Sequence, residues 1–189
     1  MGRWQPDSRG RLQEAALALY SERGFDQTTA AQIAARAGLT ERTFFRHFAD
    51  KREVLFGGSA LLEERIVAGV ASAPASDGPF AAVSRGLDAA AAMLGEFRRD
   101  LTRQRQAVIA ANPELREREL AKLADYAATV GATLRQMGVS EPRATLAAEA
   151  GMTALRVGLQ RWAGADDGQD LAATVRDVVA ELRAVAASG

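Results

Sequence analysis

Side chains that could bind phosphates and base edges are concentrated between positions 29 and 51. Hydroxyl, amide, guanidinium, imidazole and ammonium groups follow one another there: Thr29, Gln32, Thr40, Glu41, Arg42, Thr43, Arg46, His47 and Lys51. The chain has no cysteine and one histidine, which excludes zinc fingers, iron–sulfur clusters, cysteine nucleophiles and multi-histidine metal sites. We therefore expect no metal and no cofactor, and hydrogen bonding to nucleic acid as the available chemistry.

A helix-turn-helix would position these side chains. Thr29 followed by Gln32 has the capping-box pattern that begins a helix, and Gly38 ends that helix a few residues later. Thr40 can cap a third short helix that runs through His47. Since glycine has no Cβ, the chain can turn sharply between the two helices, so that the first braces the second in the major groove.

Apolar residues on the inner side of this corner would let the helices cross closely. They are Ile33, Ala34, Ala37 and Leu39, with Phe44 and Phe48 as anchors of the third helix. Ahead of them, residues 8–23 carry an apolar helical stripe that Gly24 ends. After them, Asp50 and Glu53 predict the cap of a long fourth helix that continues from Val54 to Val70.

The rest of the chain also predicts helices. Alanine is abundant, β-branched residues are sparse, and no run alternates between apolar and polar residues. Turn-rich breaks delimit helices near 80–95, 97–111, 114–137, 141–163 and 169–187. We expect an all-α fold, with a three-helix domain that contains the helix-turn-helix at 1–50, followed by roughly six further helices at 51–189.

The charge of the chain is balanced, with 24 basic and 24 acidic residues among 189. This argues against a generally polybasic nucleic-acid binder but not against a local basic face, and residues 1–55 do hold nine basic and seven acidic residues. The N-terminus lacks the apolar segment of a signal peptide, and no apolar run approaches the ~18 residues that cross a bilayer. We expect a cytoplasmic protein with no membrane partner.

The segment from Thr29 to Leu55 resembles the N-terminal DNA-binding domain of the TetR family of bacterial transcriptional regulators. The resemblance covers roughly residues 8–55 and rests on the spacings Thr29-x-x-x-Ile33-Ala34-x-x-Ala37-Gly38-Leu39-Thr40-x-x-Thr43-Phe44-Phe45-x-His47-Phe48-x-x-Lys51-x-x-Leu55. It implies a homodimer, not an enzyme, whose N-terminal helices bind a double-stranded, palindromic DNA operator. The further helices would bind a small-molecule effector and dimerise. The implied function is a repressor that a small apolar or amphipathic effector releases from its operator.

The resemblance also implies individual DNA contacts. Base or phosphate contacts fall on Thr40, Glu41, Arg42 and Thr43, near the start of the recognition helix. Thr29 would contact a phosphate at a helix N-terminus, and Lys51 would contact another as the fourth helix begins. A solvated surface position is the alternative for Arg42.

Two positions depart from the family's pattern. Phe45 stands where the family usually has a tyrosine, whose hydroxyl can bond a phosphate, so Arg46 or His47 can supply that contact instead. Phe45 itself stays among the candidate DNA-contacting residues. A structural role is the alternative for His47. Ala31 stands where relatives often have a polar residue, which leaves Gln32 as the candidate for contact there.

Apolar and arginine side chains of the later helices are candidates for the effector site. They are Phe97, Leu101, Gln104, Arg105, Val108, Tyr126, Val130, Met152 and Arg156. An arginine that faces an apolar cavity would favour an anionic ligand, whereas the alternative is an ordinary core with salt bridges between helices. The segment Arg103–Arg116 is similar to a subgroup of regulators that respond to acyl-CoA-like molecules, which implies an acyl-type effector.

The last two long helices carry apolar stripes. The first comprises Leu146, Ala150, Thr153, Ala154, Val157 and Leu159, and the second comprises Leu171, Val175, Val178, Val179, Leu182 and Val185. The resemblance implies that they pair with their symmetry mates in a four-helix bundle, and packing within one chain is the alternative. Two other functions stay open: a helical small-molecule-binding protein or enzyme without DNA function, and a DNA-binding dimer without an effector.

Overall fold

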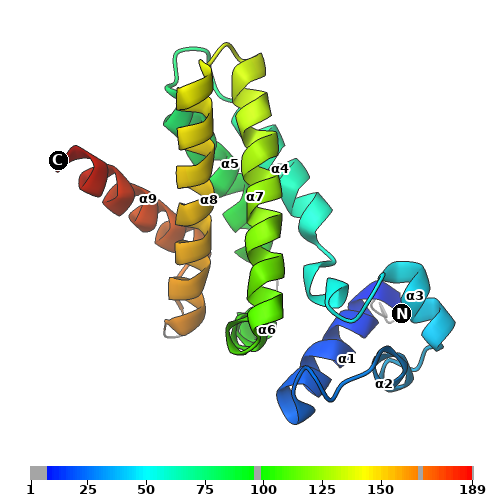
Figure 1. The fold of residues 1–189 in the computed structure, drawn as a ribbon. Coiled ribbons are helices and arrows are strands. Elements are labelled where there is room, and N and C mark those ends of the chain that lie inside the picture. The colour runs from blue at the N-terminus through cyan, green and yellow to red at the C-terminus, as the bar shows by residue number, and fades with distance from the viewer. Residues whose placement is uncertain (1–7, 96–98, 166–167, 189) are drawn as a thin grey trace, which may run out of the picture. The chain divides into compact units, whose positions relative to one another are not determined.

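The computed structural model describes residues 8–95, 99–165 and 168–188. All regular structure within these ranges is helical, as the sequence predicted (Figure 1). The helices are α1 (Ser8–Arg23), α2 (Ala30–Arg36), α3 (Glu41–His47), the 3-10 turn η1 (Glu53–Phe56), α4 (Ser59–Ala71), α5 (Pro79–Gly95), α6 (Arg99–Ala111), α7 (Pro113–Gln136), α8 (Glu141–Gly164) and α9 (Leu171–Ala187). None of these helices has a stretch long and apolar enough to span a membrane.

The chain forms two compact units, and each of them combines two stretches of sequence. The N-terminal unit contains Met1–Gly58 and Asp100–Glu119, so that most of α6 and the beginning of α7 belong to it. The C-terminal unit contains Ser59–Arg99 and Leu120–Gly189. The predicted boundary at residue 50 divides DNA binding from ligand binding, and this functional division stays a prediction.

The core of the N-terminal unit lies between α1, α2, α3 and η1, and Ile109 of α6 and Leu115 of α7 also belong to it. Leu12, Ile33 and Phe44 are fully buried there. Tyr20 packs against Phe25, with 5.1 Å between the ring centroids. The apolar stripe on α1 therefore packs against the two shorter helices, α2 and α3.

The prediction of one continuous fourth helix from Asp50 is wrong. Asp50 does cap a turn, since its Oδ1 accepts hydrogen bonds from the backbone N–H groups of Arg52 (2.7 Å) and Glu53 (3.1 Å). That turn is the short η1, and α4 begins only at Ser59. Gly57 and Gly58 separate the two, and glycine inside a helix costs about 1 kcal/mol relative to alanine.

Packing against α1 explains the break further. The Gly57 carbonyl accepts a hydrogen bond from the guanidinium of Arg9. A Cβ at position 57 would lie 2.8 Å from Nε2 of Gln13 and 2.9 Å from the ring of Phe48. A side chain at this point would therefore require Gln13 and Phe48 to shift.

Close helix crossings build the C-terminal unit. At the crossing of α4 with α5, a Cβ on Gly69 would lie 2.7 Å from the Cα of Gly86, and a Cβ on Gly86 would lie 2.7 Å from the carbonyl oxygen of Ile66. Gly158 of α8 packs on Val175 of α9, where a Cβ would lie 2.8 Å from a valine methyl. The helices of this unit thus approach almost backbone to backbone.

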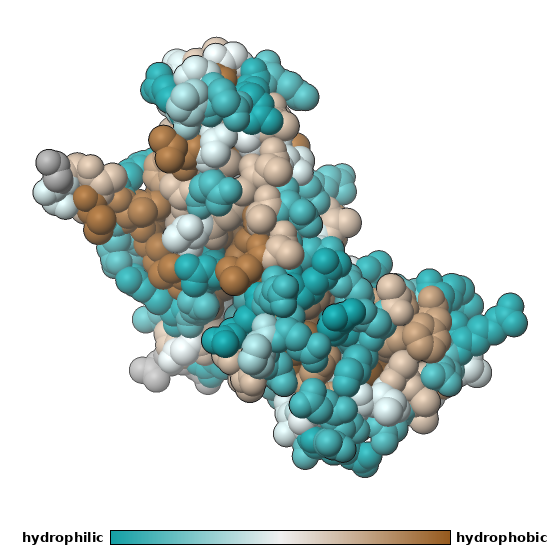
Figure 2. All heavy atoms as spheres, in the orientation of Figure 1, coloured by the Kyte–Doolittle hydropathy of each residue, from teal (hydrophilic) through white to brown (hydrophobic). Residues whose placement is uncertain are grey.

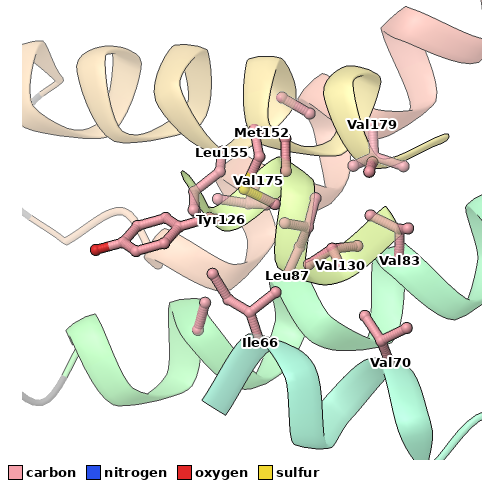
Figure 3. Close-up of a cluster of buried hydrophobic side chains, with 14 of the residues drawn as sticks. Ile66, Val70, Val83, Leu87, Tyr126, Val130, Met152, Leu155, Val175 and Val179 are labelled. Carbon is pink, nitrogen blue, oxygen red and sulfur yellow. The ribbon is translucent and has the colours of Figure 1, made fainter. Parts of the chain in front are cut away.

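An apolar cluster fills the space between these crossings. Side chains from α4, α5, α7, α8 and α9 point toward one another there (Figure 3). Leu87, Val130 and Leu155 are among its members, and each is at most 1% exposed. Because five helices contribute, the cluster holds together segments that are far apart in sequence.

Candidate nucleic-acid interface

The start of α2 carries the predicted capping box. The Thr29 hydroxyl accepts a hydrogen bond from the backbone N–H of Gln32 (3.2 Å), and the Gln32 side-chain oxygen accepts one from the backbone N–H of Thr29 (3.0 Å). This reciprocal pair satisfies two helix-end donors and fixes where α2 begins. It also engages the side-chain oxygen of Gln32, so its amide NH₂ is the group that can reach a ligand.

The turn between α2 and α3 is a rigid corner at Gly38. Its φ of 67° lies in the left-handed region that favours glycine. The N–H of Gly38 donates to the carbonyl of Ala35 (3.0 Å), and the N–H of Leu39 donates to that of Ala34 (2.9 Å). The Arg11 guanidinium also donates to the Ala37 carbonyl. No sequence pattern pairs Arg11 with a turn 26 residues later, and so this brace was missed.

Buried aromatic residues fix the rotation of α3. Phe44 is fully buried and Phe48 is 4% exposed, and their ring centroids lie 5.8 Å apart. Thr40 caps the helix by accepting a hydrogen bond from the backbone N–H of Thr43 (3.2 Å), and the two hydroxyl oxygens lie 3.0 Å apart. With Phe44 turned inward, the opposite side of α3 faces outward.

The exposed face of α3 collects most of the predicted DNA-contacting residues. Glu41, Arg42, Phe45 and Arg46 are exposed, while Thr43 and His47 are half-buried. Arg42 and Arg46 are four residues apart and therefore lie on one side of the helix, one turn from each other. Two guanidinium groups on one outward side can bind phosphates or the acceptor edge of guanine.

His47 lies at the edge of this face. Its ring centroid is 6.4 Å from that of Phe48. Its Nε2 is buried and has no hydrogen-bond partner among the residues that the structure describes. This placement is compatible with both interpretations of His47, a phosphate contact or a structural histidine.

Lys51 lies beside the loop that follows α1. Its ammonium group donates to the carbonyls of Phe25 (2.8 Å) and Asp26 (3.3 Å) and lies 4.2 Å from the centre of the Phe25 ring. Its own carbonyl accepts a hydrogen bond from Tyr20 (2.6 Å). Because an ammonium group has three donors, Lys51 can hold this loop and still donate to a phosphate.

Ion pairs and burial set the charge states around the interface. The hydrogen bonds from Arg36 hold the pKa of Glu22 below its ordinary value. Burial first, and the Asp50 carboxylate second, raise the pKa of the Tyr20 hydroxyl. Tyr20 is therefore a neutral donor in this unit, and Arg36 is held by a carboxylate rather than presented alone.

The candidate effector residues fall into both compact units. Leu101, Gln104, Arg105 and Val108 belong to the N-terminal unit, and Tyr126, Val130, Met152 and Arg156 belong to the C-terminal unit. Phe97 lies outside the described residues. Tyr126, Val130 and Met152 come together in the buried cluster of the C-terminal unit (Figure 3).

Arg105 makes its contacts within the N-terminal unit. Its Nε donates to the carbonyl of Leu55 (2.8 Å) and its Nη1 to the carboxylate of Glu119 (3.2 Å). Its guanidinium also lies 5.2 Å from the centre of the Phe56 ring. Arg105 thus ties α6 to η1 and α7, which matches the salt-bridge alternative. An effector contact by Arg105 stays a prediction.

The match to a known family falls on the segment that carries this interface. Residues 12–56, from α1 to η1, match the family described as bacterial regulatory proteins, tetR family. The HTH-type transcriptional regulator TcmR of Streptomyces glaucescens is 37% identical over 91 residues. That match covers 48% of this chain and 39% of the relative's length. Both descriptions are of regulatory proteins, and this chain spans less than half of that relative's length.

Solved structures of regulators share the whole fold. The triclosan complex of SmeT, a repressor from Stenotrophomonas maltophilia, has a TM-score of 0.62 and 20% identity, covering 94% of this chain and 90% of that one. FadR of Thermus thermophilus in complex with lauroyl-CoA has a TM-score of 0.55 and 24% identity, covering 92% of each chain. At these identities the likeness shows the fold alone. It confirms an N-terminal helix-turn-helix followed by a helical C-terminal region.

Proposed function

We propose that this chain, whose residues 12–56 match the tetR family of bacterial regulatory proteins, binds a palindromic DNA operator as a homodimer and represses transcription in the cytoplasm until a small apolar or amphipathic molecule releases it. The observation that carries the DNA-binding part is the exposed face of α3. That face is polar, carries Arg42 and Arg46, and is held in one orientation by the buried Phe44. A recognition helix needs this combination, because base edges are read by side chains on a rigid support.

We divide the proposed DNA contacts into those that read base edges and those that bind phosphates, according to where each residue lies. Arg42 and Thr43 reach base edges or nearby phosphates from α3, whereas Thr29 and Lys51 bind phosphates from the ends of their segments. Arg42→Ala should therefore weaken binding to the specific site more than to random DNA. Lys51→Ala should weaken both alike and lower the salt dependence by about one unit of slope. Equal effects of the two variants on both DNAs would contradict this division.

Apolar side chains on α8 and α9 support a homodimer. Leu146 is 69% exposed and Val185 is 72% exposed, and Figure 2 shows hydrophobic surface along α9 and its seam with α8. Other members of the two stripes, such as Val175 and Val178, are buried within the chain itself. The exposed members therefore remain for a partner, and a second copy of the chain offers the matching surface.

The charge variant Leu146→Arg tests the dimer. It should shift sedimentation toward the monomer, because it places a charge in an apolar contact. Leu120→Arg is the matched control, since Leu120 of α7 is 57% exposed and lies outside the two stripes. A monomeric wild-type chain, or equal effects of the two changes, would contradict the proposed interface.

The apolar cluster of the C-terminal unit is where we place an apolar or amphipathic effector, and its packed side chains would have to move apart to admit one. Tyr126, Val130 and Met152 lie within it, and methionine and aromatic side chains adapt well to apolar ligands. Two regulators of the same fold were solved with triclosan and with lauroyl-CoA. These two compounds are therefore the first probes for release of DNA.

Release requires that the effector bind the DNA-incompetent conformation more tightly than the DNA-competent one, a coupling that is typically worth about 1–3 kcal/mol. The covalent connection from η1 to α4 runs through Gly57 and Gly58. Two glycines form a pivot more readily than a continuous helix would. We therefore include this link, at Gly58 above all, in the proposed conformational change.

A second candidate is a DNA-binding dimer without an effector. The tight crossings at Gly69, Gly86 and Gly158 favour it, because they leave little space between the helices that they join. Thermal denaturation with lauroyl-CoA and triclosan separates the two functions. A raised melting temperature together with release of DNA supports the effector, and no shift at saturating probe supports the second candidate.

The experiment that tests DNA binding is selection of bound sequences from a random library by the purified chain, followed by the stoichiometry of the complex on the enriched sequence. We expect a palindrome with half-sites one helical turn apart, about 34 Å, or a multiple of it. The complex should contain two chains or a multiple of two. No enrichment at low salt, where phosphate contacts are strongest, would contradict the proposal.

A further inference from the structure

The exposed aromatic residue on α3 suggests how the operator is read. Phe45 is 53% exposed, and it is the one aromatic among the large apolar side chains exposed in the described part of the chain. It lies one turn from Glu41 and three residues from Arg42, on the polar face. An aromatic ring in this position can leave water by contacting an apolar group of a bound ligand.

The orientation of this ring is fixed from within the unit. The Phe45 ring meets the buried Phe44 ring nearly edge to face, with centroids 5.3 Å apart and an interplanar angle of 84°. Such pairs have a preferred geometry. Phe45 is therefore presented to a ligand in a defined position rather than as a freely moving side chain.

The chemistry of the major groove offers this ring one apolar feature. Phenylalanine has no hydrogen-bonding group, so it can bond neither a phosphate oxygen nor the donors and acceptors on base edges. The C5-methyl group of thymine is the apolar group displayed in that groove. We propose that Phe45 contacts a thymine methyl group in each half-site and thereby specifies thymine at that position.

This inference rests on the proposed DNA binding and assigns it a specificity-determining residue. Arg42 and Arg46 are exposed on the same helix and can bind the surrounding phosphates and acceptor edges. They would bring the ring against the groove. The ring would then favour thymine at that base pair by contact with its methyl group. A hydrogen-bonding side chain would instead recognise a donor or acceptor on the base edge.

The test replaces thymine by uracil, one position at a time, in the sequence obtained by selection from random DNA. This change removes only the methyl group from the base. We expect one thymine per half-site at which uracil weakens wild-type binding about fourfold, the value of one buried methyl group. Phe45→Ala should bind less tightly and should lose this uracil penalty, while Phe45→Tyr should keep the penalty because it keeps the ring.

Two control variants separate this role from a general loss of binding. Arg46→Ala should lower the affinity but leave the uracil penalty unchanged, since it removes a neighbouring charge and not the ring. Leu120→Ala removes a similarly exposed apolar side chain from α7 and should change neither quantity. Circular dichroism of Phe45→Ala confirms that the variant is folded, which its exposure favours.

The outcomes are distinguishable. An equal uracil penalty in the wild type and in Phe45→Ala, or no penalty at any thymine, would overturn the role of Phe45 while DNA binding stands. If selection enriches no sequence at all, the proposed function fails, and this inference fails with it. A penalty that disappears only with Phe45→Ala supports the assignment.

Discussion

The two compact units hold their helices together in different ways. In the N-terminal unit, caps, a glycine corner and a few buried aromatic rings fix the short helices α2 and α3. Most of these contacts join residues three or four positions apart, and the brace from Arg11 to Ala37 adds a longer-range one. In the C-terminal unit, long helices cross at glycines, and contacts join distant residues. Thr129 donates to Glu63 (2.6 Å), and Arg99 donates to the carbonyl of Trp162 (2.9 Å).

This difference suits the two tasks that we propose. A DNA-reading surface needs side chains held in one geometry, and short-range caps together with buried rings provide it. A unit that responds to a ligand needs helices that can shift by small amounts. Packed helices can slide in this way, while the glycine crossings limit how far they can separate. Substitutions that remove a cap or a buried ring of the N-terminal unit should therefore leave the C-terminal unit folded. Substitutions at the glycine crossings should likewise leave the N-terminal unit folded.

The largest effect is expected from Phe44→Ala. Phe44 is fully buried and anchors α3, so its loss should lower the free energy of unfolding by about 3–5 kcal/mol. Phe45→Ala is the matched control, since this neighbouring ring is half exposed and its loss should cost far less. Urea denaturation measures both, and hydrogen exchange should place the Phe44→Ala effect in the N-terminal unit. Faster exchange throughout α8 and α9 as well would break the comparison between the units.

A smaller effect is expected from Gly86→Ala in the C-terminal unit. The added Cβ would lie 2.7 Å from the carbonyl oxygen of Ile66 and 2.8 Å from a methyl of Val70, so that α4 and α5 must separate. We expect a net loss of about 2 kcal/mol, because overpacking outweighs the better helix propensity of alanine. Gly95→Ala is the control, since its added Cβ meets no atom within 4 Å in the described residues outside its own helix backbone and chain neighbours. Equal melting temperatures of the two variants would contradict the close crossing.

Short-range signals explain why the N-terminal unit could be predicted from sequence. Thr29, Thr40 and Gly38 act on residues within one helical turn, and the structure has both caps and the positive φ. The outward face of α3 then follows from the burial of Phe44. The break at Gly57 was missed although the glycine pair was visible, because its cause lies in packing against Gln13 and Phe48 rather than in the local pattern.

Long-range contacts explain why the later candidates could not be assigned. An apolar residue at helical spacing looks the same whether it lines a cavity or fills a core, and Tyr126 and Met152 lie in a buried cluster that either description fits. Arg105 could be recognised as unusual for its position but not paired with Leu55 and Glu119, 50 and 14 residues away. Periodicity identifies which side of a helix is buried. The residues that this side contacts are known only from the fold.

Removal of a helix cap in the N-terminal unit should lower the free energy of unfolding by about 1 kcal/mol. Thr40→Ala removes the hydrogen bond to the backbone N–H of Thr43, and an N-cap of this kind is worth about 1 kcal/mol. Ser140→Ala is the matched control in the C-terminal unit, because Ser140 stands at the N-cap of α8 without a side-chain cap hydrogen bond. Thermal denaturation should show a lower melting temperature for Thr40→Ala alone. A similar loss in both would show that α8 depends on its cap as α3 does.

The smallest effect is expected from Asp50→Asn, and it depends on pH. Burial alone would raise the pKa of Asp50, but hydrogen bonds from the Arg52 side chain and from the backbone of Glu53 and Arg52 hold it below its ordinary value. A carboxyl group with a lowered pKa adds stability above its unfolded-state pKa, and this stability is lost as the pH falls through the folded-state pKa.

The wild type should therefore be more stable than Asp50→Asn near neutral pH, and the two should converge in acid. Because the Asp50 side chain is 38% exposed, solvent screening keeps the difference to about 0.5 kcal/mol or less. Paired urea titrations from pH 7 down to pH 2 measure it. A difference that persists below the folded-state pKa of Asp50 would mean that the cap geometry of η1, rather than the charge of Asp50, supports the turn that leads to Gly57.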